Sequence, residues 1–336
     1  MRNICTPCLN ILIIKPGAVG DLLQMTPVVR ALKQYSPSAK ITMLVGAGAA
    51  AALFQNNPHV FETLVSDLSG GRKSPRAMLN LWRELRGKHY DLVLNFQRSS
   101  LRAWFLASAA LPSPVLVYHR ARNRTVHAVV NYLETLAPLG ISAAVQELEL
   151  FLDDGSRTYA RELFSSLGPG NMPLIALNPG ATHGVNRWPA VRFAELADML
   201  LENRLGNTVI VGGPDDVPLA EEIRALSRTK PLSIAGRTSL LQLGAVLEKC
   251  SVLVSGDTGP LHMATAVGTK VVALFGAADP TRTGPVGSGH RIIHAAGVAC
   301  VPCRSRTCSN SAYLECMQKI TSKEVVDAVA GMLKGG

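Results

Sequence analysis

The segment that decides the fold class is residues 252–275, VLVSGDTGPLHMATAVGTKVVALF. Its apolar run Val252–Ser255 ends in a loop with two glycines and a proline, and a second apolar run follows at Val271–Phe275. Short runs of this kind, rich in Val and Leu, are typical of buried parallel strands. The intervening residues Leu261–Val267 follow a proline that suits a first helical turn. The segment therefore predicts a strand–loop–helix–strand unit.

The same alternation of apolar runs and helical patterns extends along the whole chain. The other predicted strands are Ile11–Ile14, Ile41–Val45, Leu92–Asn95, Val115–Val117, Leu174–Asn178 and Thr208–Val211. The predicted helices are Leu22–Tyr35, Arg76–Arg86, Ala190–Asn203, Pro218–Ser227, Ser239–Lys249 and Ser322–Lys334. Such alternation predicts an α/β protein with doubly wound parallel sheets and right-handed crossovers.

The length of the chain predicts two domains. Its 336 residues are too many for one ordinary α/β unit. The turn-forming stretch Gly168–Pro173 interrupts both periodicities, and the pattern restarts after it. We predict an N-terminal domain over residues 1–168, a second domain over 173–320, and a C-terminal helix within 321–336 that can return to the first domain. Two such sheets facing each other would form a cleft lined by strand-to-helix loops.

The composition of the chain is typical of a globular protein and argues against a membrane-spanning or nucleic-acid-binding one. Apolar residues make up 47% and charged residues 17% of the chain, which is a globular composition. No apolar stretch approaches the roughly 18–20 residues that span a bilayer. The polar start Met1–Asn10 does not resemble a signal peptide, so we expect a cytoplasmic protein. Aromatic residues make up only 5%, which argues against a surface for stacking nucleic-acid bases.

The positive charge is concentrated in the first part of the chain. Residues 1–140 contain 16 Lys and Arg against 6 Asp and Glu, whereas the remainder contains 18 of each. The whole net charge of +10 therefore belongs to the first 140 residues. This asymmetry indicates an anionic partner for that half, unless it forms only a solvated basic surface.

The loop after the first predicted strand is Lys15-Pro16-Gly17-Ala18-Val19-Gly20-Asp21. Its glycines allow a tight turn or close approach to a ligand, but the spacing matches neither the P-loop nor the dinucleotide-binding motif. Asp21 has two interpretations. It is the N-cap of the next helix, or it is a general base that accepts a proton from an attacking hydroxyl. Spacing alone favours the cap.

The loop within the opening segment is Ser255-Gly256-Asp257-Thr258-Gly259-Pro260-Leu261-His262. A helix N-terminus offers unpaired N–H groups and a positive dipole end, which suit a phosphate. The donors would be the amides of Thr258, Gly259 and Leu261, with the Thr258 hydroxyl. The alternative is a capped turn, with Asp257 or Thr258 as the cap and His262 packed in the core. Spacing does not choose between these two.

Two further loops follow predicted strands in the second half. The first, residues 178–189, offers Thr182, His183 and Arg187, and an arginine can pair with a phosphate in bidentate fashion. The second, Val211–Asp215, carries two glycines that suit a base, a ribose or only a tight turn. The alternative for the first loop is an ordinary surface loop with Trp188 packed beneath it.

Four of the seven cysteines lie close together near the C-terminus. The spacing Cys300-x2-Cys303-x4-Cys308-x7-Cys316 is similar to that of metal ligands, although the second pair is looser than in common zinc modules. Structural zinc and reduced, partly buried thiols are both compatible with it. An odd number of cysteines in a reducing compartment disfavours a disulfide framework.

Taken in order, these loops resemble a known family of enzymes. Gly20-Asp21 with Thr26-Pro27 is similar to the opening of glycosyltransferase family 9, which contains the ADP-heptose:lipopolysaccharide heptosyltransferases. The other matching stretches are Arg124-x2-His127 with Tyr132 and Leu139-Gly140-Ile141, Asn178-Pro179-Gly180, Arg187-Trp188-Pro189, Gly212-Gly213-Pro214, Asp257–His262, Leu274-Phe275-Gly276, Asp279-Pro280, Gly284-Pro285 and Cys316-Met317. The resemblance covers nearly the full chain.

The resemblance implies a GT-B architecture of two Rossmann-like domains and an inverting, metal-independent sugar transfer without a resident cofactor. It implies Asp21 as the base and Thr258, Gly259 and His262 as contacts of the donor phosphate. The full set of expected donor-binding residues is Thr182, Arg187, Gly213, Asp257, Thr258, Gly259, Leu261 and His262. The expected acceptor-binding residues are Lys15, Gly20, Arg98, Arg120 and Arg124, assisted by Arg102 and Arg122. Many family members carry lysine where this chain has Asn186, so Arg187 or Lys15 would replace that contact.

The implied acceptor, lipid A with its Kdo sugars, is densely anionic and would account for the basic first half. Anionic membrane leaflets attract such surfaces too, so we expect a monomer that is peripheral at the inner face of the inner membrane. Alternatives are another nucleotide-sugar-dependent transferase of cell-surface glycan synthesis, a nucleotide-sugar epimerase of similar build, and a non-enzymatic binding protein. Few aromatics and the neutral second half disfavour a nucleic-acid partner.

Overall fold

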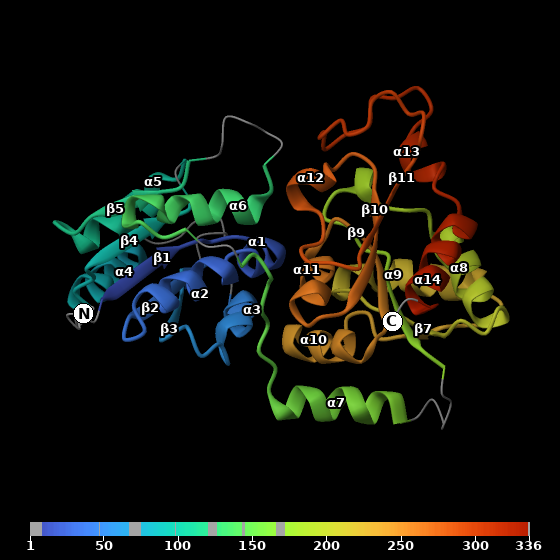
Figure 1. Cartoon of the computed structure of the whole chain (residues 1–336), viewed down its shortest axis with the longest axis horizontal. Helices are drawn as coiled ribbons and strands as arrows, with labels where there is room; N and C mark the ends of the chain where they lie inside the picture. The colour runs from blue at the N-terminus through green and yellow to red at the C-terminus, as the bar shows by residue number, and fades with distance from the viewer. Residues whose placement is uncertain are drawn as a thin grey trace. The chain divides into compact units, whose positions relative to one another are not determined.

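The computed structural model divides between Phe151 and Leu152 into two compact units (Figure 1). It describes residues 9–46, 48–66, 75–97, 99–119, 126–142, 145–165 and 172–334. The division precedes the expected boundary at residue 168. The reason is helix α7 (Asp154–Ser165), which packs on α10 (Leu240–Lys249) of the second unit. The Arg157 guanidinium there forms two hydrogen bonds of 3.1 Å to the Glu248 carboxylate.

The first unit contains a five-stranded sheet with strand order β3-β2-β1-β4-β5, and each pairing in it is parallel. Its strands are β1 (Asn10–Ile14), β2 (Lys40–Val45), β3 (Glu62–Val65), β4 (Leu92–Asn95) and β5 (Val115–Val117). Four of them were predicted from continuous apolar runs. The edge strand β3 was not, because its side chains are only partly buried and include Glu62.

The helices of the first unit alternate with these strands along the chain. They are α1 (Val19–Leu23), α2 (Thr26–Tyr35), α3 (Gly48–Ala51), α4 (Pro75–Gly87), α5 (Leu101–Ala107) and α6 (Ala128–Leu133), with 3-10 turns η1 (Ala52–Phe54), η2 (Ser108–Ala110) and η3 (Glu134–Leu139). The single helix expected over Leu22–Tyr35 is broken into α1 and α2. Pro27 lacks the N–H that would continue the helix, and the Thr26 hydroxyl donates to the Leu23 carbonyl at 2.8 Å.

The second unit contains a six-stranded sheet with order β11-β10-β9-β6-β7-β8, again with parallel pairings. Its strands are β6 (Leu174–Asn178), β7 (Asn207–Ile210), β8 (Leu232–Ser233), β9 (Val252–Gly256), β10 (Lys270–Phe275) and β11 (Arg291–His294). The opening segment of the sequence is therefore the β9–α11–β10 unit at the centre of this sheet. The two parallel sheets with alternating helices confirm the predicted α/β class.

Helices cover both faces of the second sheet. Besides α7 and α10 they are α8 (Ala190–Glu202), α9 (Val217–Leu226), α11 (Gly259–Ala266), α12 (Pro280–Thr283), α13 (Glu315–Gln318) and α14 (Ser322–Lys334), with 3-10 turns η4 (Gly184–Asn186) and η5 (Pro214–Asp216). Helix α14 packs on α8 and β10 and contributes Val325 and Val329 to their shared core. The structure thus places the C-terminal helix in the second unit instead of returning it to the first.

Alternating strand residues supply the two sides of each sheet. In β1, Leu12 and Ile14 belong to the core under α4 and α5. In β9, Val252 and Val254 belong to the core under α8, α9 and α14. Within the described part of the chain, no helix is long and apolar enough to span a membrane.

Candidate functional site

The first cluster of polar side chains lies at the carboxyl end of β1. Lys15 directly follows this strand and is buried. Its ammonium donates a hydrogen bond of 3.0 Å to the Tyr132 hydroxyl, which donates in turn to Asp21 Oδ1 at 3.2 Å. Lys15 Nζ also lies 3.7 Å from the same oxygen. A buried cation and a phenol therefore converge on one carboxylate.

An aromatic cluster fixes the position of Tyr132 on α6. Its ring packs edge-to-face against Phe96 and Tyr118, at centroid distances of 5.5 and 5.2 Å. Lys15 Nζ lies 4.9 Å from the centroid of the Tyr132 ring. Burial lowers the pKa of Lys15, although the charge of Asp21 partly opposes that effect. The contacts of the Tyr132 ring with Phe96, Tyr118 and Lys15 limit the movement of its hydroxyl relative to β1.

The structure corrects the capping interpretation of Asp21. Helix α1 begins at Val19 with Ala18 as its N-cap, so Asp21 lies inside the first turn and caps nothing. Its side chain is 46% exposed and is accessible to a substrate. Gly17 is required here because a Cβ at this position would lie 2.9 Å from Cβ of Asp21. A partly exposed carboxylate held by two buried groups is suited to proton transfer.

The structure describes only some of the remaining residues that we expect to bind the acceptor. Gly20 is the second residue of α1 and precedes Asp21. Arg102 is an exposed residue of α5. Arg98, Arg120, Arg122 and Arg124 lie outside the described residues. Sequence analysis named Tyr132 only as part of a family motif and assigned it no role. The two residues are 111 positions apart, and no local pattern indicates that Tyr132 contacts Asp21.

The second cluster lies where β9 meets α11. Thr258 is the N-cap residue of α11, followed by Gly259, Pro260 and Leu261 in the first turn. The first amides of a helix have no partner within it, and the Thr258 hydroxyl does not cap them. Instead, that hydroxyl accepts a hydrogen bond of 2.9 Å from the Asn178 amide at the end of β6. Thr258 therefore does not cap α11 with its side chain, and a helix end of this kind can bind an anion.

Asp257 and His262 support this loop from inside. His262 is buried, and its Nε2 lies 3.9 Å from Oδ1 of Asp257. The other carboxylate oxygen of Asp257 accepts a hydrogen bond of 2.9 Å from the Thr283 hydroxyl of α12. The burial agrees with the packed position that spacing allowed for His262.

The loop after β6 adjoins the loop after β9. A Cβ at Gly256 would lie 3.0 Å from the Asn186 carbonyl oxygen, so a larger residue there would crowd the neighbouring backbone. Thr182 and Arg187 are exposed in the same loop. Trp188 is buried beneath it, donates to the Ile320 carbonyl at 3.0 Å, and packs edge-to-face on Phe193. Arg187 is therefore presented to solvent on a firmly packed base.

Asp216 joins the loops after β6 and β7, a contact that no sequence motif indicated. Its Oδ2 accepts a hydrogen bond of 2.8 Å from the Gly213 amide. A side chain at Gly180 or Gly212 would overlap the Asp216 side chain. These glycines are thus needed for close packing around a carboxylate, and Gly213, which is exposed, borders the same region.

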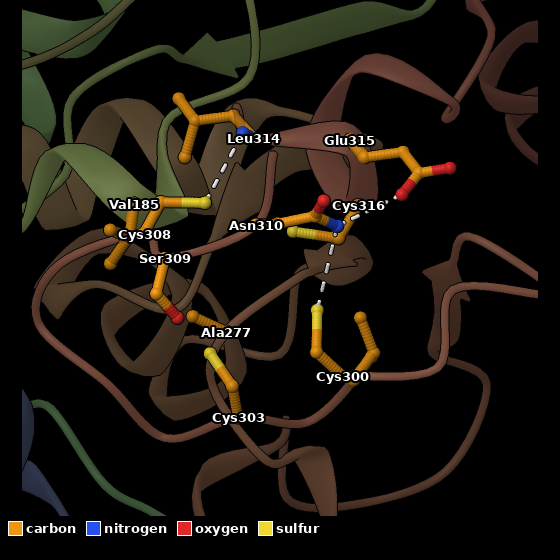
Figure 2. Close-up of a pocket in the computed structure, with 11 residues that line it drawn as sticks. Val185, Ala277, Cys300, Cys303, Cys308, Ser309, Asn310, Leu314, Glu315 and Cys316 are labelled. Atoms are coloured by element: carbon orange, nitrogen blue, oxygen red, sulfur yellow. Dashed lines mark hydrogen bonds between the residues drawn. The ribbon is translucent and has the colours of Figure 1, made fainter. Parts of the chain in front are cut away.

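The four clustered cysteines line one small pocket in the second unit (Figure 2). Asn310 Nδ2 donates to Cys300 Sγ at 3.9 Å, and the Leu314 amide donates to Cys308 Sγ at 3.3 Å. Burial, and then the neighbouring thiols, raises the pKa of Cys316. All five described cysteines are free thiols. Among the described residues, no group of three or more His, Cys, Asp or Glu side chains is arranged to hold a metal ion.

Comparison with known proteins gives the family context. A family model described as glycosyltransferase family 9 (heptosyltransferase) matches residues 78–314. Lipopolysaccharide heptosyltransferase 3 of Escherichia coli K12 is 30% identical over 281 residues, which cover 77% of this chain and 80% of that protein. Lipopolysaccharide core heptosyltransferase OpsX of Haemophilus influenzae is 26% identical over 294 residues, which cover 82% of this chain and 81% of that protein.

Two solved structures of similar proteins have the same fold as this chain. A family 9 glycosyl transferase from Veillonella parvula DSM 2008 superposes with a TM-score of 0.85 at 25% identity, covering 98% of both chains. The Escherichia coli ADP-heptose lipopolysaccharide heptosyltransferase II shares the fold, with a TM-score of 0.78 at 22% identity, covering 97% of this chain and 99% of that one. These neighbours have the GT-B architecture that the family resemblance implied. The family model matches more than half of the length of this chain. The chain therefore belongs to glycosyltransferase family 9, the heptosyltransferase family.

Proposed function

We propose that this protein is an inverting glycosyltransferase that moves a heptose from ADP-heptose to the inner core of lipopolysaccharide. The observation that carries the proposal is the Asp21 carboxylate, which a buried lysine and a buried tyrosine hold at the carboxyl end of β1 in a member of family 9. The names of the relatives, which are lipopolysaccharide heptosyltransferases, support the substrate class.

In the proposed reaction, Asp21 removes the proton from a hydroxyl of the acceptor sugar. The oxygen then attacks the anomeric carbon of the donor on the face opposite the nucleotide. A new C–O bond forms while the bond from that carbon to the diphosphate oxygen breaks, so the configuration inverts. The proton remains on Asp21, and the electron pair of the broken bond leaves with ADP.

The second unit holds the donor in this proposal. The leaving diphosphate gains negative charge, which the amides of Thr258, Gly259 and Leu261 stabilise at the start of α11. Thr182 and Arg187, both exposed beside this loop, add contacts, and Arg187 takes over the charge missing at Asn186. Gly213 adjoins the nucleoside. Asp257 and His262 act mainly by supporting the loop, because His262 is buried.

The first unit binds the acceptor in this proposal. Lys15 and Gly20 border Asp21, and Arg98, Arg120 and Arg124 meet the phosphates and carboxylates of the lipid-linked core. The protein acts as a monomer at the cytoplasmic face of the inner membrane. Since amides and an arginine supply positive potential at the diphosphate, we propose that turnover needs no divalent ion and persists in excess EDTA.

The decisive assay measures nucleoside-diphosphate release from a panel of nucleotide sugars, with and without a truncated Kdo–lipid A acceptor. We expect ADP-heptose to be consumed only when acceptor is present. Consumption of another sugar nucleotide instead would indicate a different transferase, and conversion of a donor without acceptor would indicate an epimerase. Either result would overturn the proposal.

A further inference from the structure

Helix α5 carries apolar side chains on opposite faces. Its sequence is LRAWFLA, and Ala103, Leu106 and Ala107 are buried under the first sheet. Leu101, Trp104 and Phe105 lie on the other side and are exposed, Leu101 to 86%. Soluble helices normally expose polar residues on the side opposite the core. Here the exposed side chains are larger than the buried ones, so the exposed face is itself fit for an apolar contact.

Neighbouring elements extend this face. Turn η2 continues directly from α5 and ends beside exposed Leu111. Helix α4 packs on both elements and exposes Leu79, and the Trp82 and Phe105 rings lie 6.2 Å apart. We use the name α5 ridge for Leu101, Trp104, Phe105 and Leu111. Several large exposed apolar residues on one helix and the turn that continues it are typical of an interaction surface.

Two described arginines adjoin the α5 ridge. In the sequence, residues 92–133 contain five arginines and no Asp or Glu, and Arg102 is the one of these five within the described part of the chain. Arg102 is exposed on α5 itself, and the Arg86 guanidinium of α4 donates to the carbonyls of Ala109 and Leu111, so it lies beside the ridge. Leucine, tryptophan and phenylalanine among arginines match the interface of an anionic bilayer.

The ridge also starts at the edge of the sheet where Asp21 lies. Strand β4 pairs with β1 so that Asn95 aligns with Ile14, and Ser100 caps α5 a few residues later. Leu101 therefore follows the carboxyl end of the strand beside the one that leads into Lys15 and Asp21. A lipid-linked acceptor can stay in the bilayer while its sugar reaches this edge.

From these observations we propose that the α5 ridge inserts into the interface of an anionic lipid bilayer, with Arg86 and Arg102 at the lipid phosphates. The role of the ridge in acceptor delivery rests on the proposed transferase function, whereas the membrane contact does not. The test uses sedimentation of the full chain with vesicles of phosphatidylethanolamine and phosphatidylglycerol, and with vesicles of phosphatidylcholine alone.

We expect the wild-type chain to bind the anionic vesicles and to bind neutral ones weakly. The triple variant Leu101→Gln, Trp104→Gln, Phe105→Gln should bind roughly tenfold more weakly or worse, because inserted apolar area is lost. Phe61→Gln is the matched control, since Phe61 is 65% exposed elsewhere in the same unit, and should bind as the wild type does. Raising the salt to about 0.5 M should also weaken binding.

A single-residue variant and a turnover assay complete the test. If the triple variant does not fold, Leu101→Gln alone replaces it, because that side chain is almost fully exposed. Turnover of a water-soluble acceptor should be unchanged in either variant, so loss of vesicle binding is separable from loss of transferase activity. Equal binding by wild type and variant, or a wild type that ignores anionic vesicles and self-associates through this face, would overturn the proposal.

Discussion

The hydroxyl of Tyr132 lies between two charged groups, accepting from Lys15 and donating to Asp21. This arrangement orders the carboxylate while leaving it exposed to an incoming hydroxyl. The sequence identified Asp21 as a candidate base but favoured a capping role for it. The difference arises because a cap is a local property, whereas Tyr132 reaches Asp21 only through tertiary structure.

Tyr132→Phe removes this hydrogen bond and keeps the ring in its aromatic cluster. We expect kcat to fall about tenfold to hundredfold, as for a lost orienting bond to a charged group, while the KM for the donor stays unchanged. Steady-state kinetics with varied donor measure both. Tyr35→Phe, at an exposed site on α2, is the control. A variant with wild-type kcat would remove Tyr132 from the positioning role.

Lys15 should make the proposed reaction sensitive to alkaline pH. Because burial lowers its pKa, the ammonium is lost at a lower pH than the ordinary value of 10.5. We expect kcat/KM for the acceptor to decline on the alkaline side below that value. In Lys15→Arg the decline should move to higher pH, since a guanidinium stays charged. An identical alkaline limb in both proteins would assign it to another group.

At the scale of elements, the central strands were predictable and the edges were not. Strands such as β1 and β9 are buried on both faces and appear as continuous apolar runs. The edge strands β8 and β11 are short and partly exposed, so no run marks them. The loop after β9 could be recognised in the sequence as a strand-to-helix loop with two glycines. The contacts of Asp216 could not, because they depend on Gly180, which lies in a different loop.

Gly276 shows how tightly the elements of the second unit fit. A Cβ there would lie 2.5 Å from Met317 Sδ and 3.0 Å from Cys316 Sγ, and both side chains are buried. We expect Gly276→Ala to lower the free energy of unfolding by about 1–3 kcal/mol, because the core must shift. Gly331→Ala in α14, with open space around its Cβ, should instead raise it by up to about 1 kcal/mol. Urea denaturation compares the two, and equal effects would contradict the packing.

Asp198 links α8 to the segment after α9. Burial alone would raise its pKa, but hydrogen bonds from Ser227, Thr229 and Arg228 outweigh that and hold the pKa below its usual value. A lowered folded-state pKa stabilises the fold above the unfolded value, near 3.9, and this is lost as pH falls through the folded one.

Asp198→Asn should therefore destabilise the protein by about 1–3 kcal/mol at pH 7, where the carboxylate's acceptor bonds are fully present. The difference from wild type should shrink as the pH falls below about 4, since both side chains are then uncharged. Urea denaturation at several pH values measures this. A difference that does not change between pH 7 and pH 3 would show that the charge of Asp198 is not responsible.

At the scale of the whole molecule, each unit supplies one half of the proposed chemistry. The basic first unit carries Asp21 and the α5 ridge, and the second carries the start of α11, where we propose that the diphosphate binds. The charge asymmetry in the sequence led to this proposed division of roles. The exact boundary was not predictable, because α7 belongs to the second unit through its packing on α10 and not through any local signal.

The central claim is that Asp21 is the base of a sugar transfer from a nucleotide sugar. Its most direct test measures ADP release from ADP-heptose with a truncated Kdo–lipid A acceptor, in parallel with calorimetric binding of the donor, for wild type and Asp21→Asn. We predict that turnover falls by about two orders of magnitude or more, as for a lost general base, while donor affinity stays within about twofold. Unchanged turnover in Asp21→Asn would contradict the account.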